Sequence, residues 1–90
     1  MDSKTKNFYD GLIEFMRTRI LHTVATKKFV YKVLQEQLPF VVLDITSVDE
    51  LTDTVVMWFG NASMTFTFHW QRPVIDNSFH GENFNLIKID

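Results

Sequence analysis

Three histidines and one neighbouring acid are the residues of this chain best suited to acid–base or metal chemistry. They are His22, His69, His80 and Glu82. Metal motifs place two histidines four residues apart on one helix face or use cysteine thiolates, and neither pattern occurs in the sequence. The chain contains no cysteine. We therefore predict no metal and no cofactor.

The remaining candidate groups do not match a catalytic pattern either. The serines lie in no nucleophile elbow, and no glycine-rich phosphate loop or dinucleotide fingerprint is present. Asp49, Glu50 and Asp53 lack the spacing of a calcium loop, so we interpret them as a solvated acidic turn. We predict that the protein is not an enzyme.

The charges are sorted along the chain. Seven cations and four acids give residues 1–38 a net charge of +3, whereas two cations and seven acids give residues 39–90 a net charge of −5. A basic helical face formed by Arg17, Lys27, Lys28 and Lys32 suits an acidic protein partner or nucleic-acid phosphates, or is simply solvated. Because the whole chain has a net charge of −2 and a pI near 5.8, we do not expect nucleic-acid binding as the main function.

Two amphipathic helices are predicted in the first half of the chain. Apolar residues at helical spacing indicate a helix over about residues 6–23, and a second stretch over 27–37 begins after Thr26 as N-cap and stops at Pro39. A single helix over both would be about 48 Å long, too long for a small domain, so we expect a break near residues 23–26. The alternative is a protruding long helix that pairs with a second copy.

One cation lies within the apolar arc of the first helix. This residue, Arg19, either snorkels at the edge of the apolar face or pairs with a buried carboxylate such as Asp44.

Strands are predicted after Pro39, where the apolar period changes from helical to two. We expect them at about residues 40–46, 54–59, 64–71 and 83–89, with a loop over 74–82. Ser47 and Glu50 have capping-box spacing, so either a single helical turn or a plain loop joins the first two strands.

The segments on either side of Gly60 and Asn61 predict a β-hairpin whose two faces differ. With Phe59 opposite Met64, the pairs on one face are Met57 with Phe66, Val55 with Phe68 and Asp53 with Trp70, which is the expected core face. The other face carries Thr54, Val56, Trp58, Thr65, Thr67 and His69, and the preceding strand adds Val42, Asp44 and Thr46.

Trp58 is the strongest candidate for a binding residue, because an indole combines a large contact area with one donor and is common in interface hot spots. Val56, Thr65, Thr67 and His69 would surround it. The alternative is that the 71–82 loop or a second copy of the sheet covers this side chain. We interpret His69 as a satisfied surface histidine; the alternative is that it tunes a contact with a partner.

The composition is that of one small globular domain over residues 1–90, with nine phenylalanines to anchor its core. No apolar stretch is long enough to span a bilayer, so we expect a soluble, cytoplasmic protein without membrane attachment.

The predicted fold is α+β, with two N-terminal helices on one face of a three- to four-stranded antiparallel β-meander. This order of elements resembles that of the uracil-DNA glycosylase inhibitor and other small DNA-mimic proteins. Their dense carboxylate arrays do not match a chain with a basic half, so their function is not carried over.

The function that we expect is protein–protein interaction. The chain would act as an inhibitor or adaptor that occludes a partner protein, as small phage-encoded or accessory proteins do, with the face around Trp58 as the first surface and the basic helical face as the second. The alternatives are a subunit of a homo-oligomer, a homodimer included, and nucleic-acid binding through the basic face.

Overall fold

The chain folds into two helices and a five-stranded antiparallel sheet in the computed structural model, which describes residues 3–73 and 82–90. The elements are α1 (Ser3–Arg19), β1 (Val24–Thr26), α2 (Lys27–Gln37), β2 (Val42–Asp49), β3 (Thr52–Phe59), β4 (Ala62–Gln71) and β5 (Asn83–Ile89). The sheet order is β1-β5-β4-β3-β2. This confirms the predicted α+β class. The predicted loop over 74–82 and His80 lie outside the described residues, apart from the exposed Glu82.

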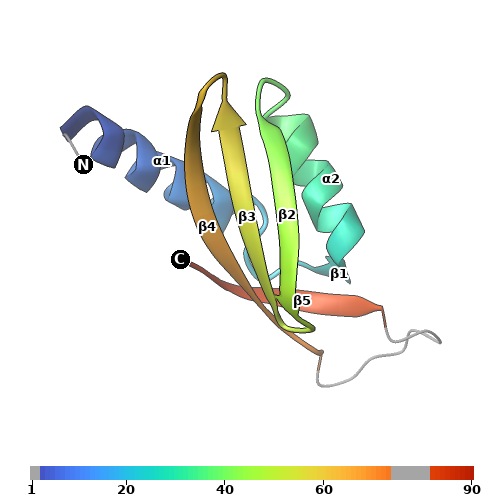
Figure 1. The fold of residues 1–90 in the computed structure, drawn as a ribbon. Coiled ribbons are helices and arrows are strands. Elements are labelled where there is room, and N and C mark those ends of the chain that lie inside the picture. The colour runs from blue at the N-terminus through green and yellow to red at the C-terminus, as the bar shows by residue number, and fades with distance from the viewer. Residues whose placement is uncertain (1–2, 74–81) are drawn as a thin grey trace.

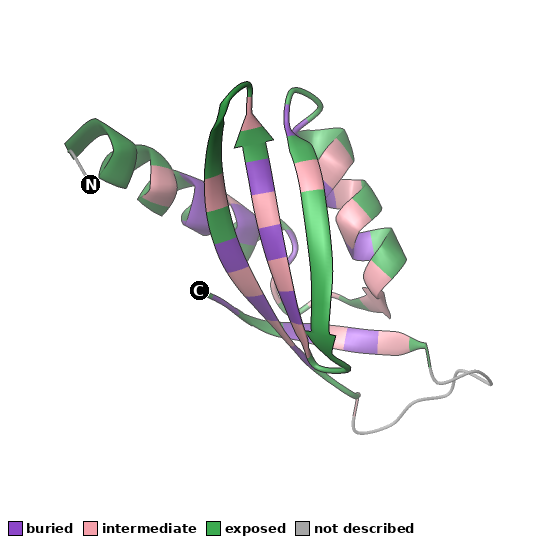
Figure 2. Ribbon diagram, in the orientation of Figure 1, coloured by how far each residue is buried: buried purple, intermediate pink, exposed green. Residues whose placement is uncertain are grey.

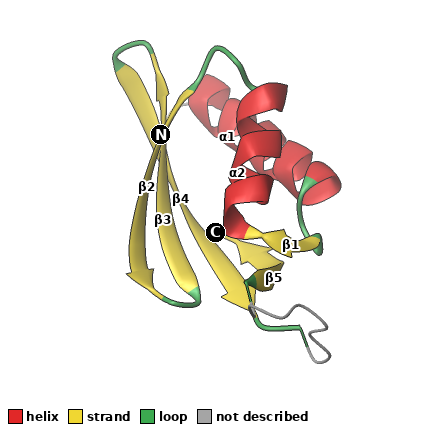
Figure 3. Ribbon diagram, turned by 90° about the vertical axis from the view of Figure 1, so that its right-hand side faces the viewer, coloured by secondary structure: helices red, strands yellow, loops and turns green. Residues whose placement is uncertain are grey.

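Both helices lie on the same side of the sheet, as Figures 1 and 3 show from two directions. The sheet is curled, and β5 crosses the lower ends of β3 and β4 in Figure 1. The long strand β4 makes this possible, because it pairs with β3 over most of its length and with β5 at its end, where the register shifts between His69 and Trp70. Such irregularities bend a strand and increase its twist.

The first helix ends at Arg19, four residues before the predicted end, and a short strand that was not predicted follows it. The chain turns at His22, whose φ is 67° and whose N–H donates to the carbonyl of Leu86 at 2.7 Å. Val24–Thr26 then pairs with β5. The break in the helix is therefore confirmed, and a contact about 60 residues away in sequence determines its form.

The second helix spans Lys27–Gln37, which is the predicted range. The Oγ1 of Thr26 accepts a hydrogen bond from the N–H of Phe29 at 3.1 Å, so Thr26 is the N-cap. Leu38 closes the helix by donating to Leu34 O, and Pro39 follows. The side chain of Gln35 donates to the carbonyls of Leu38 and Val41, which ties the end of α2 to the start of β2.

The β3–β4 hairpin has the predicted faces but not the predicted register. Phe59 pairs with Ala62, not with Met64, and Met57 pairs with Met64. The loop is therefore two residues long, with Gly60 at a φ of 67°, a conformation that glycine adopts without strain. Because the error is two residues, every side chain remains on its predicted face.

The turn between β2 and β3 is tight and contains no helical turn, so the plain-loop alternative holds. The N–H of Leu51 donates to Asp49 Oδ1 at 2.8 Å, and Ser47 Oγ donates to the carbonyl of Asp49 at 3.1 Å. The acid and the hydroxyl thus stabilise a turn locally. As a result β2 spans Val42–Asp49 instead of the predicted 40–46.

The core lies between the helices and one face of the sheet, and Figure 2 shows buried residues alternating along β3 and β4. Tyr9 stacks on Phe66 and Tyr31 stacks on Phe68, with ring centroids 5.0 and 5.6 Å apart. By contrast, β2 is exposed at nearly every position. Among the described residues, neither helix has the length and hydropathy required to cross a bilayer.

Candidate partner-binding surface

The surface of interest is the side of the sheet that faces away from both helices. Cross-strand pairs place nine residues in three rows on it. We call this surface the open face. Its first row is Val42, Trp58 and Ser63, its second row is Asp44, Val56 and Thr65, and its third row is Thr46, Thr54 and Thr67. The strands position these side chains because residues two apart on a strand share a face and paired residues lie side by side.

The most apolar part of the open face is the pair Trp58 and Val42, in the row next to the tip of the β3–β4 hairpin. These residues are direct cross-strand partners, and their exposed fractions are 39 % and 65 %. Most of the surface of the Trp58 residue is therefore already covered within the chain, and about two fifths of it remains exposed. An exposed tryptophan beside an exposed valine favours contact with a partner. Their apolar surface is in water in the free protein, and docking of a partner would remove it from water, which is energetically favourable.

Ser63 lies beside this pair on β4, and the next row of the open face consists of Asp44, Val56 and Thr65. Val56 is half-buried between Thr54 and Trp58 along β3, and Thr65 is exposed beside it on β4. Each hydroxyl can donate and accept a hydrogen bond. The open face therefore combines apolar side chains at one end with adaptable polar side chains along the rest of its length.

His69 lies at the lower end of the same face and is held by the C-terminal residue. Its Nε2 lies 2.9 Å from Asp90 Oδ2, and Lys88 Nζ lies 3.5 Å from Asp90 Oδ1. The hydrogen bond from His69 is the main cause that lowers the pKa of the Asp90 carboxyl, and the charges of Lys88 and His69 act in the same direction. His69 is thus a satisfied surface histidine, as expected.

The basic residues lie away from the open face, on the helices. Arg17, Lys28 and Lys32 are exposed, and none of them forms an ion pair within the described ranges. Arg17 is in the last turn of α1, whereas Lys28 and Lys32 are one turn apart on α2. The structure thus brings the five open-face candidates together and separates them from the three basic ones.

Arg19 is the last residue of the first helix. It is exposed, and its guanidinium carbon lies 5.7 Å from the centroid of the Phe15 ring. The predicted alternative of a pair with buried Asp44 is wrong, because Asp44 is exposed on the open face, on the other side of the sheet.

The buried carboxylate of this protein is Asp53, which is only 2 % exposed. Its Oδ2 accepts hydrogen bonds from the hydroxyl of Tyr31 at 2.7 Å and the indole N–H of Trp70 at 3.1 Å, and Lys27 Nζ lies 3.7 Å from its Oδ1. Burial and this carboxylate together raise the pKa of Tyr31 far above its ordinary value. The interpretation of Asp53 as part of a solvated turn is wrong.

Lys27 is consequently not part of an exposed basic face. Its ammonium group donates to the carbonyl of Glu50 at 2.6 Å and lies 4.6 Å from the centroid of the Phe84 ring. Glu50 in turn pairs with Arg72. These contacts and those of Asp53 connect the start of α2 to the β2–β3 turn and to β4.

A signal for this network was present in the sequence. Strand parity already placed Asp53 on the apolar face, and an acid there requires a cation or several donors. The identity of its partners was not apparent, since Tyr31 and Lys27 belong to a separate helix. Within the described ranges, no cluster of three or more histidines and acids is arranged to hold a metal ion.

Comparisons with protein-family models, with curated proteins and with solved structures find no match to this chain. Its function must therefore be inferred from the geometry of its own surfaces.

Proposed function

We propose that this protein is a non-catalytic interaction domain that binds another protein through its open face and so acts as an inhibitor or adaptor. The observation that supports the proposal is the exposed Trp58 and its cross-strand neighbour Val42 on a side of the sheet that no helix covers. The chain holds no cysteine and needs no oxidising compartment, and we propose the cytoplasm as its location.

The partner should present an apolar depression for the indole, with hydrogen-bonding groups around it. Three strands about 4.8 Å apart and five residues of about 3.4 Å each give an open face of about 14 Å by 17 Å. That is about 240 Å² in projection, compared with about 800 Å² per partner in a standard interface. A stable complex therefore requires further contacts beyond this face.

The test is the affinity of the purified partner for a Trp58→Ala variant. The partner is first captured with the wild-type protein and then produced separately, so that Kd is measured with two pure components. Since Trp is the residue type most enriched among hot spots, we expect a loss of about 2 kcal/mol, or about thirtyfold in Kd.

Ile87→Ala is the matched control. Ile87 is exposed to the same 39 % and lies on β5, outside the three rows of the open face. We expect less than about a threefold change in Kd for this variant. Equal affinity of wild type and the folded Trp58→Ala variant would contradict the proposal.

Two further measurements separate the rival functions. A molar mass above that of a monomer that falls on dilution, and that Trp58→Ala reduces to the monomer, would assign the open face to self-association. Salt-sensitive retention on DNA or RNA that disappears with Lys28→Glu and Lys32→Glu would assign the protein to nucleic-acid binding. We expect neither result.

A further inference from the structure

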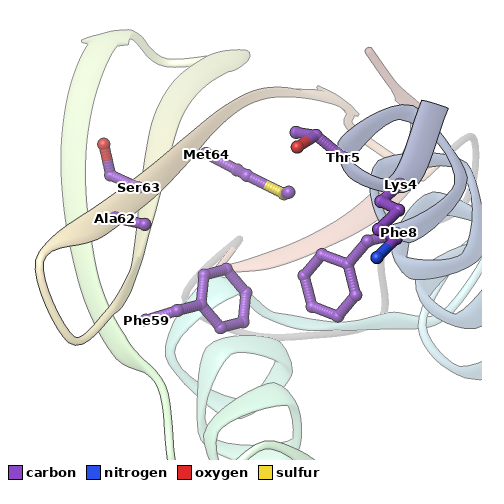
Figure 4. Close-up of a pocket in the computed structure, with 7 residues that line it drawn as sticks. All are labelled: Lys4, Thr5, Phe8, Phe59, Ala62, Ser63 and Met64. Carbon is purple, nitrogen blue, oxygen red and sulfur yellow. The ribbon is translucent and has the colours of Figure 1, made fainter. Parts of the chain in front are cut away.

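A pocket of about 340 Å³ lies where the first turns of α1 meet the tip of the β3–β4 hairpin. Figure 4 shows its side chains approaching from these two elements. The residues that matter are Lys4, Thr5 and Phe8 from α1 and Phe59, Ala62 and Met64 from the hairpin. The volume is at the lower end of the range of about 300 to 1,000 Å³ that is usual for ligand pockets.

Aromatic side chains form the apolar part of this site and remain unusually exposed. The Phe8 ring meets the Phe59 ring edge-on with centroids 5.2 Å apart, and the Phe40 ring, outside the pocket lining, has its centroid 6.4 Å from that of Phe59. Phe8 is 48 % exposed and Phe40 is 68 % exposed. In Figure 1 the N-terminal end of α1, which carries Phe8, projects past the edge of the sheet.

The pocket has one cation at its rim. Lys4 precedes Phe8 by four residues and therefore lies on the same side of the helix, whereas Lys6 lies about 160° away from Phe8 around the helix axis. Lys4 forms no ion pair with any residue that the structure describes, and the first turn of α1 contains no acid. The positive end of the helix dipole adds to this charge.

We propose that this pocket binds a segment of a partner protein that carries a large apolar side chain next to an acidic residue. The apolar side chain lies among Phe8, Phe59 and the flexible Met64, and the carboxylate pairs with Lys4. Methionine suits such a site because its thioether adapts to different shapes and packs well on aromatic rings.

The inference rests on the proposed function in one respect, since its occupant is part of a partner protein. It also supplies contact area that the open face lacks. The pocket and Trp58 both belong to the tip of the β3–β4 hairpin, since Trp58 adjoins Phe59 along β3. Trp58 and the pocket lie on opposite sides of the sheet at this tip, because consecutive residues of a strand point to opposite faces. A partner that contacts both must therefore extend around the hairpin tip.

The experiment uses short synthetic peptides and ¹⁵N-labelled full-length protein. The probe is an acetylated and amidated pentapeptide with phenylalanine at its centre, followed by glutamate, with alanine elsewhere. Two control peptides replace the glutamate with lysine or the phenylalanine with alanine. We expect the first peptide to shift the amide signals of Phe8, Phe59, Ala62 and Met64, and each control to bind at least about threefold more weakly.

Two lysine variants of equal charge test the contact with the carboxylate. Lys4→Glu should weaken binding of the phenylalanine–glutamate peptide by about threefold or more, because it replaces attraction with repulsion. Lys6→Glu changes the net charge equally on the other side of the helix, and it should change binding by less than about 1.5-fold at physiological salt. Phe8→Ala removes the ring that meets Phe59, and in a variant whose far-ultraviolet circular dichroism matches the wild type it should weaken binding by at least about fivefold.

Three results would overturn the inference: no amide shift at millimolar peptide, shifts confined to the open face, or equal effects of Lys4→Glu and Lys6→Glu. The outcome for the proposed function is separate. If Trp58→Ala abolishes binding of the purified partner while Lys4→Glu and Phe8→Ala leave it unchanged, the open face is the binding surface and the pocket is not. If the pocket variants abolish it and Trp58→Ala does not, the reverse holds.

Discussion

The hydroxyl of Tyr31 should be one of the most important single groups for the stability of this domain. It donates at 2.7 Å to the carboxylate of Asp53, which is only 2 % exposed. Tyr31→Phe removes this donor and leaves the ring in place on Phe68. Because almost no water reaches the carboxylate, a solvent molecule cannot easily replace the lost hydrogen bond.

The size of the effect follows from the charge of the acceptor. A hydrogen bond to a charged group contributes about 1.5 to 3 kcal/mol, so we expect Tyr31→Phe to lower the free energy of unfolding by about 2 kcal/mol. Asp53 retains Trp70 and Lys27, and the variant should therefore still fold. For a domain of this size the loss corresponds to a decrease in Tm of about 8 to 16 °C.

The assay is urea unfolding followed by far-ultraviolet circular dichroism, with Tyr9→Phe as the matched control. Tyr9 also stacks on a phenylalanine of β4, but it is not among the donors to Asp53. Its loss of a hydroxyl should therefore cost less than about 0.5 kcal/mol. If the two variants lose equal stability, the hydrogen bond to Asp53 is not the cause and the argument fails.

Three other predictions concern the same structural features. First, the free energy of unfolding should fall as the pH rises above about 10, because the unfolded chain then releases the Tyr31 proton that the folded chain retains. This contribution approaches about 1.4 kcal/mol per pH unit. The slope of unfolding free energy against pH should be shallower in Tyr31→Phe, and equal slopes in urea titrations would exclude this role. Second, His22→Gly should raise Tm or leave it unchanged, because glycine tolerates the φ of 67° at this position. The control Thr23→Gly, at an ordinary φ, should lower the free energy of unfolding by about 0.5 to 1 kcal/mol. A large decrease in Tm for His22→Gly would show that the backbone at His22 is not strained. Third, Thr26→Ala should lower the free energy of unfolding, measured by chemical denaturation, by about 1 kcal/mol, and Thr26→Ser should lower it much less, because only alanine removes the oxygen that caps α2. Equal losses in the two variants would show that the cap does not contribute to stability.

The local patterns of the sequence were sufficient for the α+β class and for the assignment of side chains to faces. Helical spacing, the cap at Thr26 and the stop at Pro39 are all short-range signals, and α2 occupies the predicted residues. The alternation along β3 and β4 placed Met57 and Phe66 in the core although their register was wrong. Parity survives a shift of two residues, which is why the faces were more predictable than the pairs.

The missed strand β1 depends on a contact between distant segments, whereas the β2–β3 turn depends on local hydrogen bonds. The strand β1 exists because Val24–Thr26 pairs with β5, and three residues with no turn signal do not reveal such a partner. The spacing of Ser47 and Glu50 is compatible with a helical turn, and Asp49 is compatible with the plain turn that forms, in which it accepts from the N–H of Leu51. The local pattern did not decide between these two structures.

For the candidate surfaces, the sequence identified Trp58 and its neighbours but not the pocket beside α1. The open face follows from alternation on adjacent strands, which is a property of the backbone. The pocket instead joins residues near 4 to 8 with residues near 59 to 64, and no spacing in the chain relates them. The feature of this pocket that the sequence could have indicated is the four-residue spacing of Lys4 and Phe8, which places both on one face of the helix.

The sequence by itself determined the helix and strand periods and the face on which each side chain of the β3–β4 hairpin lies, because these periods are set by the backbone. Only the tertiary structure decided the partners: which strand joins the sheet edge, which donors surround Asp53, and which rings meet at the hairpin tip. These choices depend on the relative placement of whole elements, and packing selects that placement from arrangements that the local pattern permits equally.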